Sequence, residues 1–187
     1  MIKLVIFDLD GTLINTIADL ANSTNYALSL CGFPTHQTDA YNLFVGNGIN
    51  KLFERALPEG AKTEENILRV RNLFLPHYDK HGHSYSEPYP GIAELLNTLQ
   101  DKGLKLAVAS NKYQDATEKM VAHFFPAIAF VSVLGQREGI PPKPDPSIVN
   151  EILAKAGAGK EETLYIGDSG VDMETVRNSG VIGAGVT

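Results

Sequence analysis

The run Leu4-Val5-Ile6-Phe7-Asp8-Leu9-Asp10-Gly11-Thr12 is apolar at first and ends abruptly in two acids, a glycine and a threonine. Its apolar half suits a strand buried on both faces, whereas Asp8 and Asp10 could not stay unpaired in a dry layer. We therefore expect the two acids where the strand emerges from the core. Residues two apart in a strand share a face, so both carboxylates would aim at one place if extended geometry persists to Asp10. Gly11 would then allow a sharp turn.

Two carboxylates held close together repel each other and need a compensating partner. A shared proton, a buried Lys or Arg, or a hard divalent cation bound through oxygen could each supply it. With Mg2+ present, a carboxylate can approach a phosphate and attack phosphorus as a nucleophile. A surface Asp-Gly turn is the simpler alternative, since such turns are common after strands.

The composition is that of an ordinary globular protein. The 187 residues are 43% hydrophobic and 20% charged, which fits one domain, or one domain with a smaller insertion. No apolar run is long enough to cross a bilayer and no signal-peptide pattern precedes Asp8, so we expect a cytoplasmic protein without a membrane partner. The net charge of -6 argues against a nucleic-acid partner. A single cysteine, Cys31, fits a reducing compartment.

Residues 15–83 are predicted to form a helical insertion. Apolar residues at helical spacing indicate helices, Pro58-Glu59-Gly60 ends one of them, and Thr63 offers the cap of another. Gly46-Asn47-Gly48 is interpreted as a connection between helices, or alternatively as a flexible lip near a ligand. Four potential zinc ligands lie close together in the sequence at His77, Asp79, His81 and His83. No cysteine accompanies them and the stretch is rich in Gly, Ser and Pro, so we interpret it as a solvated linker.

From Tyr89 onward, predicted helices and strands alternate, which is typical of a parallel sheet with helices on both faces. Polar residues follow two of these strands, as they follow the first strand of the chain. Ser110-Asn111 follows a strand at 104–109, and Asp168 and Asp172 follow a strand that begins at Thr163. Lys143 lies between prolines in the loop after a strand predicted at 128–134, which would hold its ammonium rigidly.

Each of these features also has a purely structural explanation. Ser110-Asn111 could cap a helix, Asp168 could be a turn residue, and Asp172 could be an acid in a first helical turn. Their coincidence favours a site, because the carboxyl ends of parallel strands lie on one edge, where open α/β sheets bind ligands. That edge would collect acids for a metal, oxyanion donors and one cation, which together suit phosphoryl transfer.

Four motifs, in order and over nearly the whole chain, resemble those of the haloacid-dehalogenase-like phosphohydrolases, most closely the phosphoglycolate-phosphatase-like branch. They are Asp8-Leu9-Asp10-Gly11-Thr12, Ser110-Asn111, Lys143-Pro144 and Gly167-Asp168-Ser169-Gly170-Val171-Asp172. The resemblance implies an α/β fold with a Rossmann-like catalytic core made of residues 1–14 and 84–187. It also implies that residues 15–83 are a small helical cap domain closing over that core.

The resemblance further implies distinct roles for the two acids of the first motif. Asp8 would attack phosphorus to form an aspartyl-phosphate, while Asp10 would protonate the leaving alcohol and then activate the hydrolytic water. Mg2+ would be held by Asp8, the main-chain carbonyl of Asp10 and Asp168, with Asp172 as direct or water-mediated support. Ser110, Asn111 and Lys143 would bind the phosphoryl oxygens.

The implied substrate is a small phosphorylated metabolite resembling phosphoglycolate, whereas the residues do not distinguish a monomer from a homodimer. A sugar-phosphate mutase of the same family is one alternative, although Thr12 favours the phosphatases by resemblance. A non-catalytic binding protein on the same scaffold is another. Two departures from the family pattern are Asn15, where Asp is more usual, and the end of the chain at Thr187, where relatives continue. Without further chain there, we expect an edge or face of the sheet to be less covered unless an oligomer compensates.

Overall fold

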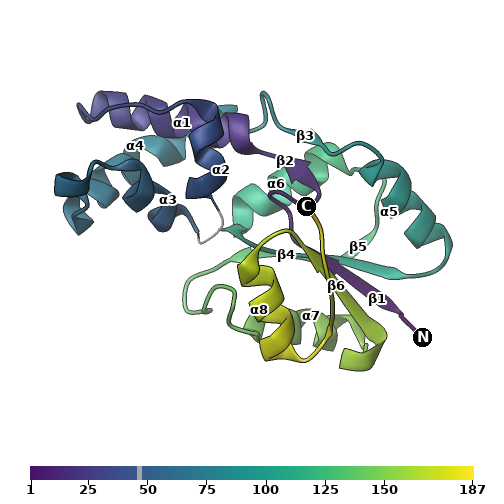
Figure 1. Cartoon of the computed structure of the whole chain (residues 1–187). Coiled ribbons are helices and arrows are strands. Elements are labelled where there is room, and N and C mark those ends of the chain that lie inside the picture. The colour runs from purple at the N-terminus through teal and green to yellow at the C-terminus, as the bar shows by residue number, and fades with distance from the viewer. Residues whose placement is uncertain (46–47) are drawn as a thin grey trace. The chain divides into compact units, whose positions relative to one another are not determined.

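The computed structural model describes residues 1–45 and 48–187, so Gly46 and Asn47 of the predicted Gly46-Asn47-Gly48 connection lie outside the described residues. The chain divides into two compact units, which are coloured along the sequence in Figure 1. Unit 1 consists of Met1–Ile14 and Pro88–Thr187, and unit 2 of Asn15–Glu87.

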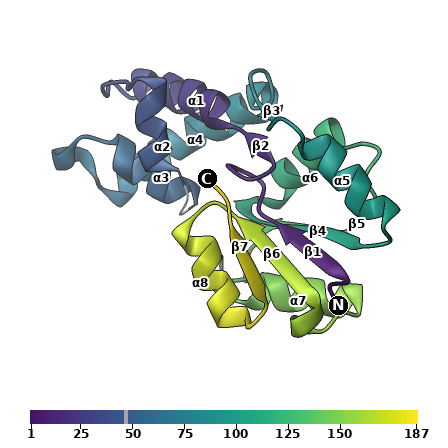
Figure 2. The ribbon, with the colours of Figure 1, turned by 45° about the vertical axis from the view of Figure 1, so that its right-hand side comes forward.

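Unit 1 is built on a parallel sheet of five strands in the order β5-β4-β1-β6-β7. The first strand lies in the middle, with β4 and β6 as its neighbours, as Figure 2 shows. This arrangement confirms the predicted α/β fold class. The strands are β1 (Leu4–Phe7), β4 (Lys105–Tyr113), β5 (Phe130–Gln136), β6 (Thr163–Gly167) and β7 (Ile182–Gly185).

Alternate residues of β1 pack into two different hydrophobic layers. Leu4 and Ile6 belong to a core shared with α7, while Val5 and Phe7 belong to a core shared with α5 and α6. Both faces of β1 contact apolar layers, so polar residues do not alternate with apolar ones along the strand, and the run before Asp8 is entirely apolar. The covering helices are α5 (Ile92–Asp101), α6 (Gln114–Phe124), α7 (Ser147–Ala156) and α8 (Gly170–Ser179), with a short 3-10 turn η3 (Lys160–Glu162).

Unit 2 consists of helices around a core of its own, with the aromatic rings of Phe53 and Phe74 5.1 Å apart at their centroids. The hydroxyl of Thr63 accepts the N–H of Asn66 and so caps the longest helix, as the sequence predicts. The helices are α1 (Ile17–Leu30), α2 (Tyr41–Phe44), α3 (Ile49–Ala56) and α4 (Glu64–His81), with 3-10 turns η1 (Thr38–Ala40) and η2 (Glu59–Ala61).

The interpretation of the histidine stretch as a linker is wrong for His77, Asp79 and His81, because α4 continues to His81. Pro76 lies inside this helix and removes one backbone donor. Packing outweighs that loss, since Phe74 and Tyr78 on either side of it are buried and stack with centroids 5.0 Å apart. The backbone leaves the helix only at Gly82.

The two crossings between the units pair with each other as a two-stranded sheet, β2 (Ile14–Asn15) and β3 (Glu87–Pro88). Just before β3, the buried carboxylate of Asp19 in α1 accepts the N–H groups of Tyr85 and Ser86 and the Ser86 hydroxyl. These bonds tie residues 85–86 to α1. The chain accordingly re-enters unit 1 at Pro88, whereas the sequence placed the start of the second core segment at residue 84.

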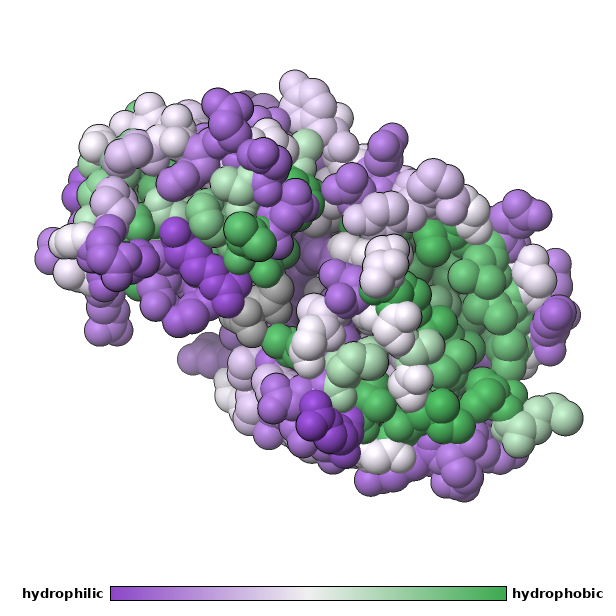
Figure 3. Space-filling model, in the orientation of Figure 1, coloured by the Kyte–Doolittle hydropathy of each residue, from purple (hydrophilic) through white to green (hydrophobic). Residues whose placement is uncertain are grey.

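Some large apolar side chains of unit 1 remain exposed, among them Leu95 of α5 and Ile182 of the edge strand β7. Figure 3 shows apolar surface gathered over unit 1. Among the described residues, no helix combines the length and the apolar character that crossing a membrane requires.

Candidate active site

Asp8 is placed by β1, directly after the last residue of that strand. Its main-chain N–H donates to the carbonyl of Ile166 over 2.9 Å, which prolongs the pairing of β1 with β6. Its carboxylate Oδ1 accepts the N–H of Leu9 at 2.7 Å. The Asp8 carboxylate is therefore fixed at the carboxyl edge of the sheet, and the residue is only 8% exposed.

The chain turns immediately after Asp8, so Asp8 and Asp10 do not continue one strand. The carbonyl of Leu9 accepts the N–H groups of Leu13 and Ile14, and Gly11 has a φ of +87°. The condition for both carboxylates to aim at one place is therefore not met. Asp10 instead places its Oδ1 2.9 Å from Nζ of Lys112, whose side chain is 7% exposed.

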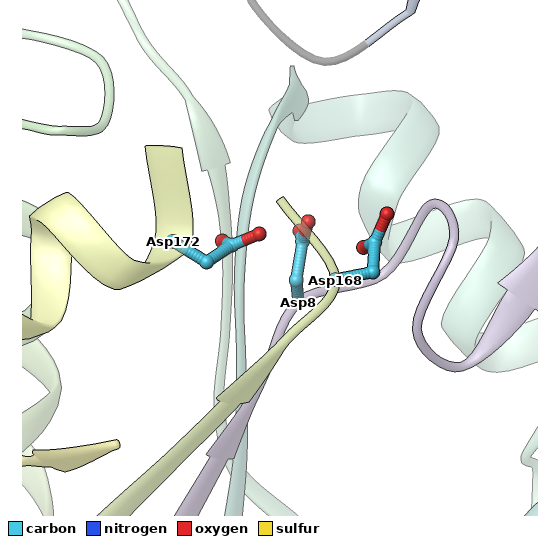
Figure 4. A group of neighbouring side chains, drawn as sticks. All are labelled: Asp8, Asp168 and Asp172. Carbon is cyan, nitrogen blue, oxygen red and sulfur yellow. The ribbon is translucent and has the colours of Figure 1, made fainter. Parts of the chain in front are cut away.

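Three carboxylates do converge at this edge of the sheet. Asp8, Asp168 and Asp172 each offer an oxygen, and the three oxygens lie within 4.8 Å of one another. Figure 4 shows Asp172 pointing toward Asp8 from the first turn of α8, while Asp168 lies beside Asp8 on the loop after β6. Carboxylate oxygens are the ligands that hard divalent cations prefer, so this donor set fits Mg2+ or a similar ion. In residues 1–45 and 48–187 it is the only such group of three His, Cys, Asp or Glu side chains.

The loop after β1 positions Asp168. The hydroxyl of Thr12 donates to Asp168 Oδ1 over 2.8 Å. A Cβ atom on Gly11 would lie 2.4 Å from Oδ2 of Asp168, closer than any real contact. Gly11 is therefore required twice, for its positive φ and for the space that the Asp168 carboxylate occupies.

The ammonium of Lys143 lies between two of these acids. Its Nζ is 3.0 Å from Asp8 Oδ1 and 2.7 Å from Asp172 Oδ1, and the lysine is 5% exposed. The hydroxyl of Tyr165 accepts a third hydrogen bond from the same ammonium at 3.0 Å. A buried charge of this kind is tolerable only because it is paired on all sides.

Both carboxylate oxygens of Asp172 are already engaged within the protein. Oδ1 accepts from Lys143 and from the hydroxyl of Tyr165, which lies 2.9 Å away. Oδ2 accepts the N–H and the hydroxyl of Ser169, the residue that caps α8. Asp172 is fully buried, so these bonds hold it in one orientation.

The pKa values of Asp8 and Asp172 shift in opposite directions. Burial raises the pKa of Asp8 to about 7, and the nearby Lys143 offsets only part of that effect. Burial also acts on Asp172, but Lys143 and the hydrogen bonds from Ser169 and Tyr165 outweigh it and hold the pKa below its ordinary value. The pKa of Lys143 is well above its usual value, because its attraction to Asp8 and the other acids outweighs burial. The protein thus disfavours the ionised form of Asp8 much more than that of Asp172.

Ser110 and Asn111 lie within β4, near its carboxyl end, because the strand continues to Tyr113 and does not end at residue 109 as the sequence predicted. Ser110 is 2% exposed, and its hydroxyl oxygen accepts the N–H of Lys112 at 3.1 Å. The side chain of Asn111 is used by the main chain of Lys143: its Oδ1 accepts the Lys143 N–H at 2.8 Å, and its Nδ2 donates to the Lys143 carbonyl at 3.0 Å. The structure thus brings all seven residues predicted for the site to the carboxyl side of one sheet, with Asn111 facing Lys143 and Asp10 facing Lys112.

Sequence reasoning assigned no role to Lys112 or Tyr165. Lys112 directly follows Ser110-Asn111, and its position at the carboxyl end of a predicted strand could have marked it as a second cation for the same edge. Tyr165 lies within an apolar run, where the only signal is that a buried tyrosine hydroxyl normally needs a polar partner.

Comparisons with known proteins agree with the motifs and the fold. A family model described as haloacid dehalogenase-like hydrolase matches residues 5–186. The phosphoglycolate phosphatase of Vibrio parahaemolyticus is 33% identical over 191 residues, covering 100% of this chain and 84% of that protein. The one of Agrobacterium fabrum is 35% identical, covering 98% and 80%. A crystal structure of a predicted phosphoglycolate phosphatase from Haemophilus somnus superposes with a TM-score of 0.91 at 30% identity, covering 100% of this chain and 85% of that one. The chain therefore belongs to the haloacid dehalogenase-like hydrolases and is an enzyme related to phosphoglycolate phosphatases, which confirms the family and the enzyme class expected from its sequence.

Proposed function

We propose that this enzyme hydrolyses a small phosphomonoester, phosphoglycolate or a close analogue, through an aspartyl-phosphate on Asp8. The observation that carries the proposal is the pairing of Asp8 with a buried cation, Lys143, beside a cluster of carboxylates. The phosphoglycolate phosphatases among its relatives supply the substrate class. Asn15–Glu87 is proposed to be the cap domain, the part in which substrate selection is expected.

The acids near Asp8 call for a divalent cation. Within the described residues, Lys143 pairs with both Asp8 and Asp172, Lys112 pairs with Asp10, and Asp168 adds a further carboxylate to the cluster of Asp8 and Asp172. Mg2+ would be held by Asp8, Asp168 and the main-chain carbonyl of Asp10, with Asp172 supporting it through water, and its charge would let a phosphate approach Asp8. The engaged oxygens of Asp172 favour the indirect arrangement.

The chain's own residues then divide the reaction into two displacements. In the first, an Asp8 oxygen bonds to phosphorus, the bond from phosphorus to the alcohol oxygen breaks, and Asp10 gives its proton to that oxygen. In the second, water attacks the same phosphorus, Asp10 takes the proton of the water, and the bond to Asp8 breaks. Ser110 and Lys143 bind the phosphoryl oxygens, and Lys112 steadies the Asp10 carboxylate between the two steps.

A substrate panel tests this proposal. The purified enzyme with Mg2+ is expected to release inorganic phosphate from phosphoglycolate faster than from sugar phosphates, because the proposed substrate class is a small acid ester. Phosphate release is measured colorimetrically, and the sugar phosphates are also examined by 31P NMR. Isomerised sugar phosphate without free phosphate would instead identify a mutase, and a lack of turnover of every ester in the panel would contradict the proposed substrate class.

Replacing Asp10 by Asn is expected to lower kcat about 10²- to 10⁴-fold while leaving Mg2+ affinity nearly unchanged. The side chain of Asp10 contacts Lys112, and only its main chain is proposed to contact the metal. Mg2+ affinity is measured by calorimetry on both the enzyme and the variant. Asp168→Asn is the matched control, because it can still accept from Thr12 but should weaken Mg2+ binding. Equal loss of Mg2+ affinity in the two variants would contradict the assignment.

A further inference from the structure

Lys143 is held at both of its ends, at the main chain by Asn111 and at the ammonium by Tyr165. We propose that these two residues are positioning residues, which fix the Lys143 ammonium for phosphoryl transfer without touching the substrate. The inference rests on the proposed function, because it assigns Lys143 to the phosphoryl group.

The main-chain contact is a pair of hydrogen bonds. Asn111 accepts from the Lys143 N–H and donates to the carbonyl of the same residue, at 2.8 and 3.0 Å. A peptide segment gripped in both directions cannot rotate about its own axis without breaking one of the bonds. Both polar atoms of the Asn111 side chain are hydrogen-bonded to the main chain of Lys143. We therefore assign Asn111 to positioning the lysine and not to binding the phosphate.

The ammonium contact is a closed triangle of hydrogen bonds. Lys143 donates to Tyr165 at 3.0 Å and to Asp172 at 2.7 Å, and the tyrosine hydroxyl itself donates to the same Asp172 oxygen at 2.9 Å. An ammonium has three N–H donors, and the third lies 3.0 Å from Asp8. Tyr165 and Asp172 therefore hold two of the three donors, and this directs the third toward Asp8 and the phosphoryl group that Asp8 is proposed to receive.

Tyr165 is well suited to such a role because it cannot move easily. It is fully buried in the middle of β6, between Ile6 of β1 and Gly183 of β7. Asp8 and Asp172 compete for the Lys143 ammonium, and Asp172 is the closer of the two, at 2.7 Å against 3.0 Å. By donating to Asp172, Tyr165 satisfies part of that carboxylate and leaves the ammonium in reach of the nucleophile.

Accurate placement of the ammonium matters for the reaction more than for binding. Displacements of about 1 Å can cost 10²-fold in rate, because a charge must match the transition state closely. Without the Tyr165 hydroxyl, one N–H donor would lack an acceptor in a buried place, and the ammonium would shift toward the two acids. The loss should therefore appear in kcat and in the binding of a transition-state mimic, and much less in KM.

The test compares Tyr165→Phe with Tyr41→Phe. Both tyrosines are fully buried, but the Tyr41 hydroxyl donates to Asn25 in unit 2. Tyr165→Phe is expected to lower kcat about tenfold and to weaken orthovanadate binding about as much, with KM changed less than about threefold. Tyr41→Phe should leave all three unchanged. Vanadate affinity is independent of the fraction of active enzyme, so simple destabilisation would not alter it.

Asn111→Ala is the second variant, with Asn178→Ala as its control. Asn178 donates to the carbonyl of Pro144, the next residue of the same loop, but not to Lys143. Asn111→Ala should reproduce the losses of kcat and vanadate affinity, and Asn178→Ala should not. If circular dichroism shows that Tyr165→Phe is unfolded, Asn111→Ala alone decides whether the positioning of Lys143 affects kcat and vanadate affinity.

Unchanged kcat and vanadate affinity in both folded variants, with an active parent enzyme, would overturn the inference. If the parent enzyme itself releases no phosphate from any ester, the proposed function fails. Calorimetric binding of orthovanadate then still reports whether Tyr165 and Asn111 support an anion site at Lys143.

Discussion

Asp8→Asn is expected to abolish phosphate release, lowering kcat by roughly 10³-fold or more, because the amide cannot attack phosphorus. The overall fold should persist, since the Asn111-to-Lys143 and Lys143-to-Asp172 contacts do not involve Asp8. Phosphate release under saturating Mg2+ measures the loss, and circular dichroism monitors the fold. Asp101→Asn, at the exposed end of α5, is the matched control and should keep full activity. Full activity of Asp8→Asn would refute the aspartyl-phosphate mechanism.

The same variant reports on the raised pKa of Asp8. The carboxyl has an ordinary pKa of 3.8 and one of about 7 in the folded protein, so folding favours its protonated form. In EDTA, this group therefore stabilises the protein below about pH 4, and that contribution is lost as the pH rises through 7. Asp8→Asn lacks this contribution, and its free energy of unfolding should fall less over the same pH range. Mg2+ should restore stability to the parent at neutral pH, because it binds the ionised form.

The elements that position the site were predictable wherever the sequence carries strong local signals. The buried run of β1 ends at Phe7, directly before the acids. The bounds of α7 also follow from local signals, because Pro146 precedes the helix and Gly157, with a φ of +62°, closes it. The parallel arrangement of the strands then brings residues far apart in sequence to one edge. For this reason the sequence alone could predict which residues meet at this edge of the sheet.

The partners within the site were not predictable in the same way. Lys112 and Asp10 are 102 positions apart, and Asn111 and Lys143 are 32 apart. These contacts depend on β4 lying beside β1 and on the turn at Gly11, and neither the strand order nor the turn geometry is encoded locally. In the histidine stretch a local signal was present but misleading. Pro76 favours the end of a helix, yet α4 continues past it because Phe74 and Tyr78 pack in the core. Local rules fix the elements, whereas long-range packing decides which side chains meet.

Lys143→Met is expected to lower the free energy of unfolding by about 3–5 kcal/mol in EDTA, because it leaves Asp8 and Asp172 buried without their cation. Urea denaturation measures the change. The same substitution at Lys155 is the control: its ammonium is exposed and pairs with Glu151 one helical turn away, an interaction of at most about 0.5 kcal/mol. If Lys143→Met is no more destabilising than Lys155→Met, the ion pairs at Asp8 and Asp172 do not stabilise the fold.

Adding Asp172→Asn to Lys143→Met separates the structural role of the lysine from its role in the reaction. The double variant removes one buried charge of each sign, so part of the lost stability should return, as expected when a buried pair is replaced as a whole. Activity should not return, because no ammonium then faces the phosphoryl oxygens near Asp8. Recovery of stability and activity together would mean that Lys143 only neutralises Asp172, and the proposed contact with the phosphate would have to be given up.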